Sequence, residues 1–175
     1  LKKMRRQYSR EEFLLIAQKL RKIDPHFAIT TDIIVGFVDE TEVDYQETLS
    51  LVREIEFDSA FMFAYSPREG TKSYELGDSV PDALKQERLQ KLIELQNSIT
   101  MERTKLLLGE QRKILIEGAS HKNPNEMIGK TECFKKVILS EKSSIGVEPG
   151  QIISAQINDI NGWTLRGEAL STQPE

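Results

Sequence analysis

Two glycine-containing segments of the sequence combine residue types that could bind a polar ligand. In the first, Gly36 lies near the end of the apolar stretch 27–37 and precedes an acidic helix start. Glycine lets a backbone turn sharply or approach a ligand closely, and the amides that open a helix can hold a polar group. In the second, "YSPREGT", a rigid turn could direct Arg68 toward a carboxylate or a phosphate. An ordinary strand-to-helix turn and a solvent-exposed arginine remain the alternatives.

Three other candidate motifs lack the residues that their chemistry needs. Gly129–Thr131 reads like the end of a phosphate-binding loop, but Pro124 stands where that loop requires a glycine. His26, His121 and Cys133 are far apart in sequence, so we expect no metal site made by this chain alone. No Ser-His-Asp or Cys-His arrangement has local support. Catalytic residues are therefore not assigned.

The elements that position these residues alternate between helix and strand in the first half of the chain. A capping box at Ser9 and Glu12 opens a predicted helix over 10–23. Residues 27–37 and 57–65 are apolar and β-branched with little alternation, which is typical of strands covered on both faces of a parallel sheet. Between them Thr41 can cap a second helix. This order predicts βαβ units and an α/β fold.

The second half changes to short apolar runs at close intervals. After a helix that opens at Pro81 and ends near Arg103, "KILIEG", "KTECFKKVIL", "QIISAQINDI" and "WTLRGEAL" are separated by Gly, Pro, Asn and Ser. This spacing predicts an all-β domain, a small barrel whose closure removes exposed strand edges. We therefore predict an α/β part over residues 1–103, a barrel over 104–170 and a tail over 171–175.

Composition limits the classes of protein that these elements can build. The chain has 175 residues, 38% of them hydrophobic, and a net charge of −4. It contains no apolar run long enough to cross a membrane, no secretory signal pattern and one cysteine, Cys133. We expect a soluble cytoplasmic protein with no membrane partner. A nucleic-acid partner would have to be bound by local cationic patches, because the total charge is negative.

Read in order, these segments resemble the C-terminal half of the radical-SAM methylthiotransferases. "TTDIIVGF..ET" matches the family's Thr-Asp-Ile-Ile-Val-Gly-Phe-Pro-Gly-Glu-Thr, "FDSAFMFAYSPREGT" matches its last-strand signature, and its Met-x-Arg-x-Tyr-Thr pattern matches Met4, Arg6, Tyr8 and Ser9. "RKILIEG...IGKTECFKKVIL" resembles the TRAM domain, a small OB-like barrel associated with RNA binding. The resemblance implies the C-terminal part of a radical-SAM (βα) partial barrel followed by a TRAM β-barrel. One departure is Val38-Asp39 where the family has Pro-Gly.

The resemblance also implies cofactors and the residues that bind them. Members of the family use S-adenosylmethionine and two 4Fe-4S clusters held by cysteines, whereas this chain has one cysteine. We therefore expect a fragment that is not catalytic alone, with the cluster ligands outside it. The residues implied at the S-adenosylmethionine site are Arg6, Thr31, Asp32, Gly36 and Glu40. Those implied in substrate contact are Tyr65, Arg68, Lys113, Lys130, Lys135 and Arg166.

The "FDSAF" wording and Arg68 are most similar to family members that act on tRNA. They imply addition of a methylthio group to the N6-isopentenyl-adenosine next to the anticodon, with the anticodon stem-loop as partner and a monomeric complete enzyme. Three alternatives stay open. They are a methylthiotransferase for threonylcarbamoyl-adenosine in tRNA, one for a ribosomal protein, and a non-catalytic RNA-binding module.

Overall fold

The computed structural model describes residues 1–170, which fall into two compact units. The first runs from Leu1 to Thr100, and the second begins at Met101, a little before the predicted division. The predicted tail, residues 171–175, lies outside the described residues. In the part of the chain that the structure describes, no helix is long and apolar enough to cross a membrane.

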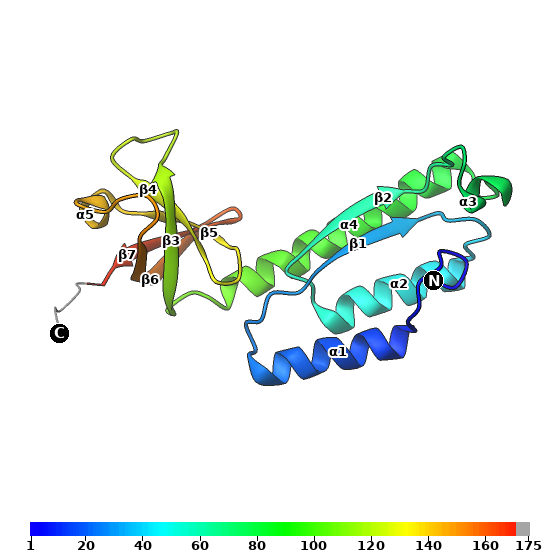
Figure 1. Ribbon diagram of the computed structural model, residues 1–175, viewed down its shortest axis with the longest axis horizontal. Coiled ribbons are helices and arrows are strands. Elements are labelled where there is room, and N and C mark those ends of the chain that lie inside the picture. Colours follow the sequence, from blue (N-terminus) through cyan, green and yellow to red (C-terminus); the bar gives the residue numbers. More distant parts are fainter. Residues whose placement is uncertain (171–175) are drawn as a thin grey trace. The chain divides into compact units, whose positions relative to one another are not determined.

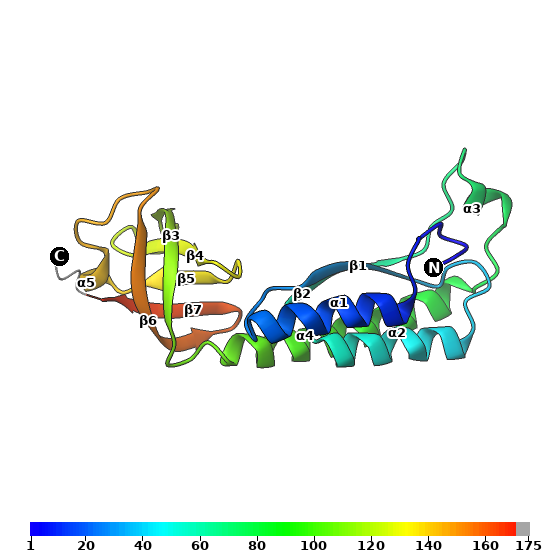
Figure 2. The ribbon, with the colours of Figure 1, turned by 60° about the horizontal axis from the view of Figure 1, so that its bottom comes forward.

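The first unit is a two-stranded parallel sheet with helices on one of its faces (Figures 1 and 2). Its strands pair in parallel from Thr30 opposite Ser59 to Val35 opposite Ala64. The predicted strand-helix-strand order and the parallel pairing are confirmed. The elements are α1 (Arg10–Ile23), β1 (Thr30–Val35), α2 (Glu42–Ile55), β2 (Ser59–Ala64), α3 (Lys72–Glu75) and α4 (Asp82–Lys105).

Local hydrogen bonds fix where α1 and α2 begin. The Ser9 hydroxyl accepts from the amide of Glu12, and the Glu12 carboxylate accepts from the amide of Ser9. Thr41 and Asp44 make the same reciprocal pair at the start of α2. Each box satisfies two of the amides that a helix start leaves unpaired, so both helices start where the sequence predicts.

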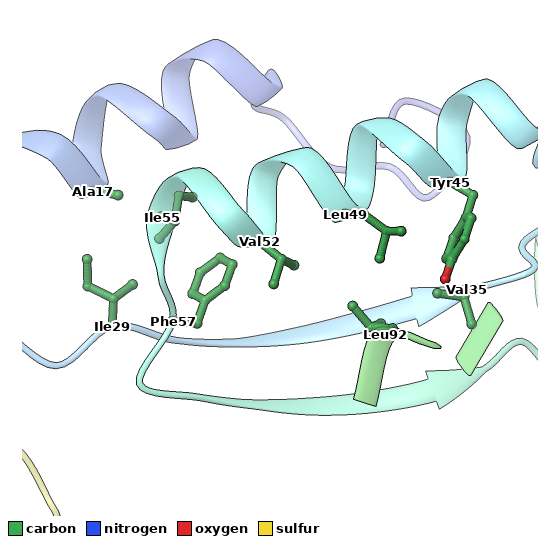
Figure 3. Packing of buried hydrophobic residues seen from close by; sticks show 9 residues of the cluster. All are labelled: Ala17, Ile29, Val35, Tyr45, Leu49, Val52, Ile55, Phe57 and Leu92. Carbon is green, nitrogen blue, oxygen red and sulfur yellow. The ribbon is translucent and has the colours of Figure 1, made fainter. Parts of the chain in front are cut away.

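The core of the first unit lies between the helices and one face of the sheet (Figure 3). Tyr45, Leu49 and Val52 of α2 point toward β1, and Leu92 enters from α4. Burial of this apolar surface is the main force that holds the helices on the sheet. The buried cluster consists of Ala17, Ile29, Val35, Tyr45, Leu49, Val52, Ile55, Phe57 and Leu92.

The other face of the sheet is exposed, so the prediction that both faces would be covered is wrong for this chain. Phe61 and Phe63 of β2 are 70% and 52% exposed, and Ile34 of β1 is 40% exposed. The register places Asp32 opposite Phe61 and Ile34 opposite Phe63 on this face. The sequence correctly shows apolar residues on both faces, but the helices within residues 1–170 cover only one of them.

The second unit is a closed five-stranded barrel, which confirms the predicted small β-barrel. The strand order is β3-β4-β5-β7-β6, and β6 returns to pair with β3. β5 and β7 are parallel, whereas the other pairs are antiparallel. The elements are β3 (Gln111–Ala119), β4 (Met127–Thr131), β5 (Lys136–Leu139), α5 (Glu141–Ser144), β6 (Ile152–Asn161) and β7 (Thr164–Ala169).

The run "KTECFKKVIL" is divided between two strands by a tight turn. β4 ends at Thr131 and β5 begins at Lys136. The Thr131 amide donates to the Lys135 carbonyl at 3.0 Å, and the Phe134 amide donates to the Thr131 carbonyl at 3.0 Å. The buried Thr131 hydroxyl also accepts from the Lys135 amide at 3.1 Å. Tight turns of this kind usually contain Gly or Asn, which mark them in a sequence. This turn has neither and is stabilised by the Thr131 bonds instead.

Candidate functional site

The Gly36 turn at the end of β1 depends on glycine for two reasons. Gly36 has φ +70°, in the left-handed region that other residues rarely adopt. A Cβ on this residue would lie 2.4 Å from Cγ of Lys85, so the side chain of a helix residue fills that space. The Gly36 amide donates to Oε1 of Glu40 at 2.8 Å. Lys85 and Glu40 therefore occupy the space and the amide that Gly36 could otherwise offer to a ligand.

Glu40, in the loop that follows Gly36, forms a buried ion pair with Arg88 of α4. The side chains of Glu40 and Arg88 are 10% and 4% exposed, and Nη1 of Arg88 lies 2.8 Å from Oε1 of Glu40. Nη2 of Arg88 reaches the exposed Glu42 at 3.1 Å, and hydrogen bonds from Gln46 and Arg88 lower the pKa of Glu42. The Tyr45 hydroxyl donates to the Arg88 carbonyl at 2.9 Å. Glu40 thus positions the turn from inside the protein.

Lys85 connects α4 to the loop that follows β2. Its side chain is 2% exposed and pairs with Asp78 and Asp82. Burial opposes the charge, but the bonds to Asp78 and Asp82 outweigh it and raise the pKa of Lys85 above its ordinary value. Its ammonium lies 5.8 Å from the centre of the Tyr65 ring. Lys85 therefore packs between the two loops that predicted site residues occupy.

Tyr65 lies at the carboxyl end of β2, whereas Arg68 extends into solvent. The Tyr65 hydroxyl donates to the Ser73 carbonyl at 3.1 Å, and its ring packs edge-on against Phe37 at 4.9 Å. The Tyr65 amide donates to the Val35 carbonyl at 2.8 Å, which joins the two strand ends. Within residues 1–170, the exposed guanidinium of Arg68 makes no hydrogen bond or ion pair. It can therefore reach a ligand without breaking a contact.

The structure separates Thr31 from Asp32 and leaves Arg6 in the N-terminal segment. Adjacent strand residues point to opposite faces, so Thr31 lies on the helix-covered face and Asp32 on the exposed face. Asp32 is the member of this pair that a ligand on the exposed face could reach. The exposed Arg6 side chain has no partner among the described residues. Gly36, Glu40 and Tyr65 are therefore the predicted residues that meet at the strand ends.

Val38 and Asp39 preserve a turn at the position where the resembling family has Pro-Gly. Asp39 has φ +60°, the region that glycine favours, and Val38 is 4% exposed. The Asp39 carboxylate pairs with Lys3 at 2.8 Å, and its amide donates to the Ser79 hydroxyl at 2.8 Å. Hydrogen bonds from Lys3 and Ser79 lower the pKa of Asp39. A residue other than glycine is disfavoured at this positive φ, and the bonds to Lys3 and Ser79 stabilise Asp39 in that conformation.

The barrel brings most of the predicted cations to its outer surface on adjacent strands. Leu115 lies opposite Lys130, and Lys130 lies opposite Lys136. Opposite residues share a face, and so do residues two apart, so Lys113 joins them on the outside. Arg166 lies opposite Ile138 on β5 and is also outside. Lys136 is exposed, whereas the neighbouring Lys135, which the resemblance implied in substrate contact, is half-buried.

Two of these cations have acidic partners on the same surface. Lys130 pairs with Glu117 at 2.8 Å, and both side chains are nearly half exposed. Arg166 pairs with Glu126 at 3.0 Å. Lys135 is half-buried in the turn before β5 and contributes its backbone to that turn. The exposed Lys130–Glu117 pair is weak, so a phosphate could displace Glu117 at small cost. The side chain of Glu126 is only 13% exposed, so Arg166 is the more firmly held cation.

Buried cations of α4 are the site residues that sequence reasoning missed. Lys85 and Arg88 belong to a helix whose residues are largely polar, so nothing in the sequence distinguishes them from solvent-exposed cations. Among the described residues, no group of three or more His, Cys, Asp or Glu is placed to hold a metal ion. Two candidate binding surfaces remain. One is the rim at the carboxyl ends of β1 and β2, where Gly36, Glu40 and Tyr65 lie, and the other is the cationic outer surface of the barrel.

Comparison with known proteins first identifies the class of the second unit. Residues 105–170 match the family model described as "TRAM domain". The barrel is therefore similar to a TRAM domain, and it follows an α/β unit with a parallel strand pair.

Curated relatives match both units and carry one name, tRNA-2-methylthio-N(6)-dimethylallyladenosine synthase. The chain is 43% identical over 173 residues to the synthase of Treponema pallidum (strain Nichols) and 46% identical over 171 residues to that of Anoxybacillus flavithermus. It is 42% identical over 171 residues to that of Clostridium botulinum (strain Okra / Type B1). Each alignment covers 97% of this chain but only 37%, 32% and 37% of those relatives. The chain thus spans about a third of their length and is similar to their C-terminal part.

Proposed function

We propose that this chain is the C-terminal part of a tRNA methylthiotransferase that uses radical-SAM chemistry. The substrate would be the N6-isopentenyl-adenosine next to the anticodon. The observation that carries the proposal is the similarity of 42–46% identity over 97% of the chain, which spans both units. Modification of tRNA by such an enzyme belongs to the cytoplasm, and the complete enzyme would act as a monomer.

The exposed face of the first unit supports a role as one wall of a larger barrel. A two-stranded parallel sheet is rare by itself, because parallel strands are normally covered on both faces. Here Ile34, Phe61 and Phe63 remain exposed, and each strand has an unpaired edge. In the complete protein, we propose, further strands and ligands cover this surface. The unit would then be the last part of a radical-SAM (βα) partial barrel.

The residues at the rim are compatible with a nucleoside cofactor on the exposed face. Asp32 lies opposite the exposed Phe61 in the strand register, and a carboxylate and an aromatic ring on one face suit the hydroxyls and sulfonium charge of S-adenosylmethionine. Arg6 and Thr31 would border the site, while Gly36 and Glu40 would shape it through the closed turn. S-adenosylmethionine and two 4Fe-4S clusters would supply the radical and sulfur chemistry of the complete enzyme. The cluster ligands would lie outside this chain.

The outer surface of the barrel supports tRNA binding, with the anticodon stem-loop as the proposed partner. Lys113, Lys130, Lys136 and Arg166 lie on adjacent strands and can contact successive phosphates. Lys135 would contribute from the turn before β5. Tyr65 and Arg68 would act at the mouth of the catalytic barrel, near the modified base. Phosphate contacts of this kind release counterions, so binding should weaken as salt concentration rises.

Charge reversal at Lys130 and Lys136 tests this surface. We expect Lys130→Glu and Lys136→Glu each to weaken tRNA binding and to reduce the slope of log affinity against log salt by about 1. Fluorescence anisotropy with labelled tRNA across a salt series measures both quantities. Lys19→Glu, an exposed change of the same charge on α1, is the matched control. Equal losses in all three variants would show a general charge effect and contradict the assigned surface.

A further inference from the structure

We propose that Phe134 and Trp163 form a stacking site for an unpaired RNA base at one end of the TRAM barrel. This inference rests on the proposed RNA-binding function and adds to it a contact that neither the family match nor the relatives' names assign. Proteins bind single-stranded nucleic acid with aromatic side chains that stack on the bases and with cations that contact the phosphate backbone. The barrel provides both at this end.

The two aromatic residues come from neighbouring turns. β5 and β7 are adjacent and parallel, with Val137 opposite Leu165. Phe134 shortly precedes the start of β5, and Trp163 immediately precedes the start of β7. Because parallel neighbours begin at the same end, both turns project from one end of the barrel. Figures 1 and 2 both show the β4–β5 turn and the β6–β7 turn at that end.

Both side chains are exposed, and Phe134 is held in an unfavourable backbone conformation. Phe134 is 79% exposed and Trp163 is 49% exposed. Phe134 has φ +59°, at a turn position where Gly or Asn is the ordinary choice. The bonds made by Thr131 and Lys135 fix the backbone on both sides of it. The backbone of Phe134 takes part in the turn, but its bulky apolar side chain does not belong to the buried core, which suggests a role for that side chain at the surface.

The charges around this end favour a polyanion over an apolar protein partner. Lys135 and Lys136 directly follow Phe134, and Lys136 lies opposite Lys130. Glu132, in the same turn, accepts a long bond of 3.4 Å from the backbone amide of Lys113. Glu117 is the acidic partner of Lys130. Around the β4–β5 turn three lysines face two glutamates, and on the β6–β7 side Asp159 lies opposite Arg166. The excess charge is therefore positive, and a phosphate backbone fits beside the stacked base.

The test compares RNA with and without unpaired bases, using the 175-residue chain. The probes are a labelled RNA stem-loop and a fully paired duplex of the same length. We expect Phe134→Asn to weaken stem-loop binding roughly 5- to 100-fold and to leave duplex binding almost unchanged. Phe134→Tyr should keep the stem-loop affinity. Ile145→Asn is the matched control, because Ile145 is 83% exposed and follows α5, beyond the other end of β5.

A second readout uses Trp163, the only tryptophan of the chain. Its fluorescence should be quenched by the stem-loop and not by the duplex, because stacking brings a base against the indole. The melting temperature of Phe134→Asn should equal or exceed that of the parent, since Asn tolerates a positive φ better than Phe. A loss of affinity therefore cannot be assigned to unfolding.

The outcomes separate this inference from the function on which it rests. If the parent chain binds neither RNA, the proposed RNA-binding function fails. If it binds the stem-loop and Phe134→Asn binds it equally well, only the stacking site fails, and the exposed aromatics would belong to a protein contact. If Phe134→Asn weakens stem-loop and duplex to the same degree, the aromatic ring acts without an unpaired base and the inference is overturned.

Discussion

Replacing Arg88 by methionine should lower the free energy of unfolding of the first unit by about 3–5 kcal/mol. Arg88 is 4% exposed and is the ion-pair partner of Glu40, whose side chain is 10% exposed. Without it, the Glu40 carboxylate would stay buried and, among the described residues, would keep the Gly36 amide as its donor. Leaving a charge buried without its counter-charge costs far more than an intact pair contributes. Urea denaturation followed by circular dichroism measures the change.

Two further variants isolate the buried charge as the cause. Glu40→Gln combined with Arg88→Met removes both charges, so the double variant should recover part of the lost stability relative to Arg88→Met. Arg53→Met is the matched control, because Arg53 is exposed on α2 and its replacement should change stability by less than about 0.5 kcal/mol. A loss below about 1 kcal/mol for Arg88→Met would contradict the assigned role of this pair.

Replacing Gly36 by alanine should destabilise the same turn by about 2–4 kcal/mol. One part of this cost is the backbone, because φ is +70° and an L side chain is disfavoured there. The other part is steric, because the new Cβ would lie 2.4 Å from Cγ of Lys85. Cγ is close to the helix backbone, so Lys85 cannot move aside without disturbing its bonds to Asp78 and Asp82.

Gly70→Ala separates the two parts of this cost. Gly70 also has a positive φ, +79°, but nothing lies within 4 Å of its Cβ position. It should therefore lose only the conformational part, about 1–2 kcal/mol. The difference in unfolding free energy between the two alanine variants measures the contact with Lys85. If both variants lose the same unfolding free energy, the contact between position 36 and Lys85 does not contribute to stability. The steric reason for glycine at position 36 would then be wrong.

Much of the fold could be predicted because the responsible signals are local. The capping boxes at Ser9 and Thr41 place the starts of α1 and α2, and the apolar spacing of α2 matches its buried face. Close spacing of short apolar runs indicated the closed barrel. The β4–β5 turn could not be located in advance, because Thr131 makes its bonds and Phe134 occupies a position where Gly or Asn would have been the signal.

The candidate site was harder to predict because its contacts join distant residues. Gly36 was recognised as a turn, yet its partner Lys85 lies in another element and reads in the sequence as an exposed helix cation. Arg88 has the same appearance in the sequence, but it is buried against Glu40 and the Tyr45 ring, which belong to other elements. Asp32 and Thr31 were predicted as a pair, whereas the pleat of β1 directs them to opposite faces.

The exposed face of the first unit shows how far one chain can specify a site. Its apolar residues were correctly recognised as strand residues that need covering, but the cover is absent from the described residues. The relatives' alignments extend over only about a third of their length, which is consistent with other segments that could supply it. Sequence reasoning therefore predicted the apolar strands, and the site on their exposed face stays a prediction that rests on the resemblance.

The nucleosides of cellular tRNA provide the most direct test of the proposed function. Total tRNA from cells with the intact gene and from cells that lack it would be digested and compared by liquid chromatography and mass spectrometry. We expect the 2-methylthio derivative of N6-isopentenyl-adenosine to be present in the first sample and absent from the second, where the unthiolated nucleoside accumulates. Identical nucleoside profiles in the two samples would contradict the proposed function and favour a ribosomal protein as substrate or a non-catalytic role.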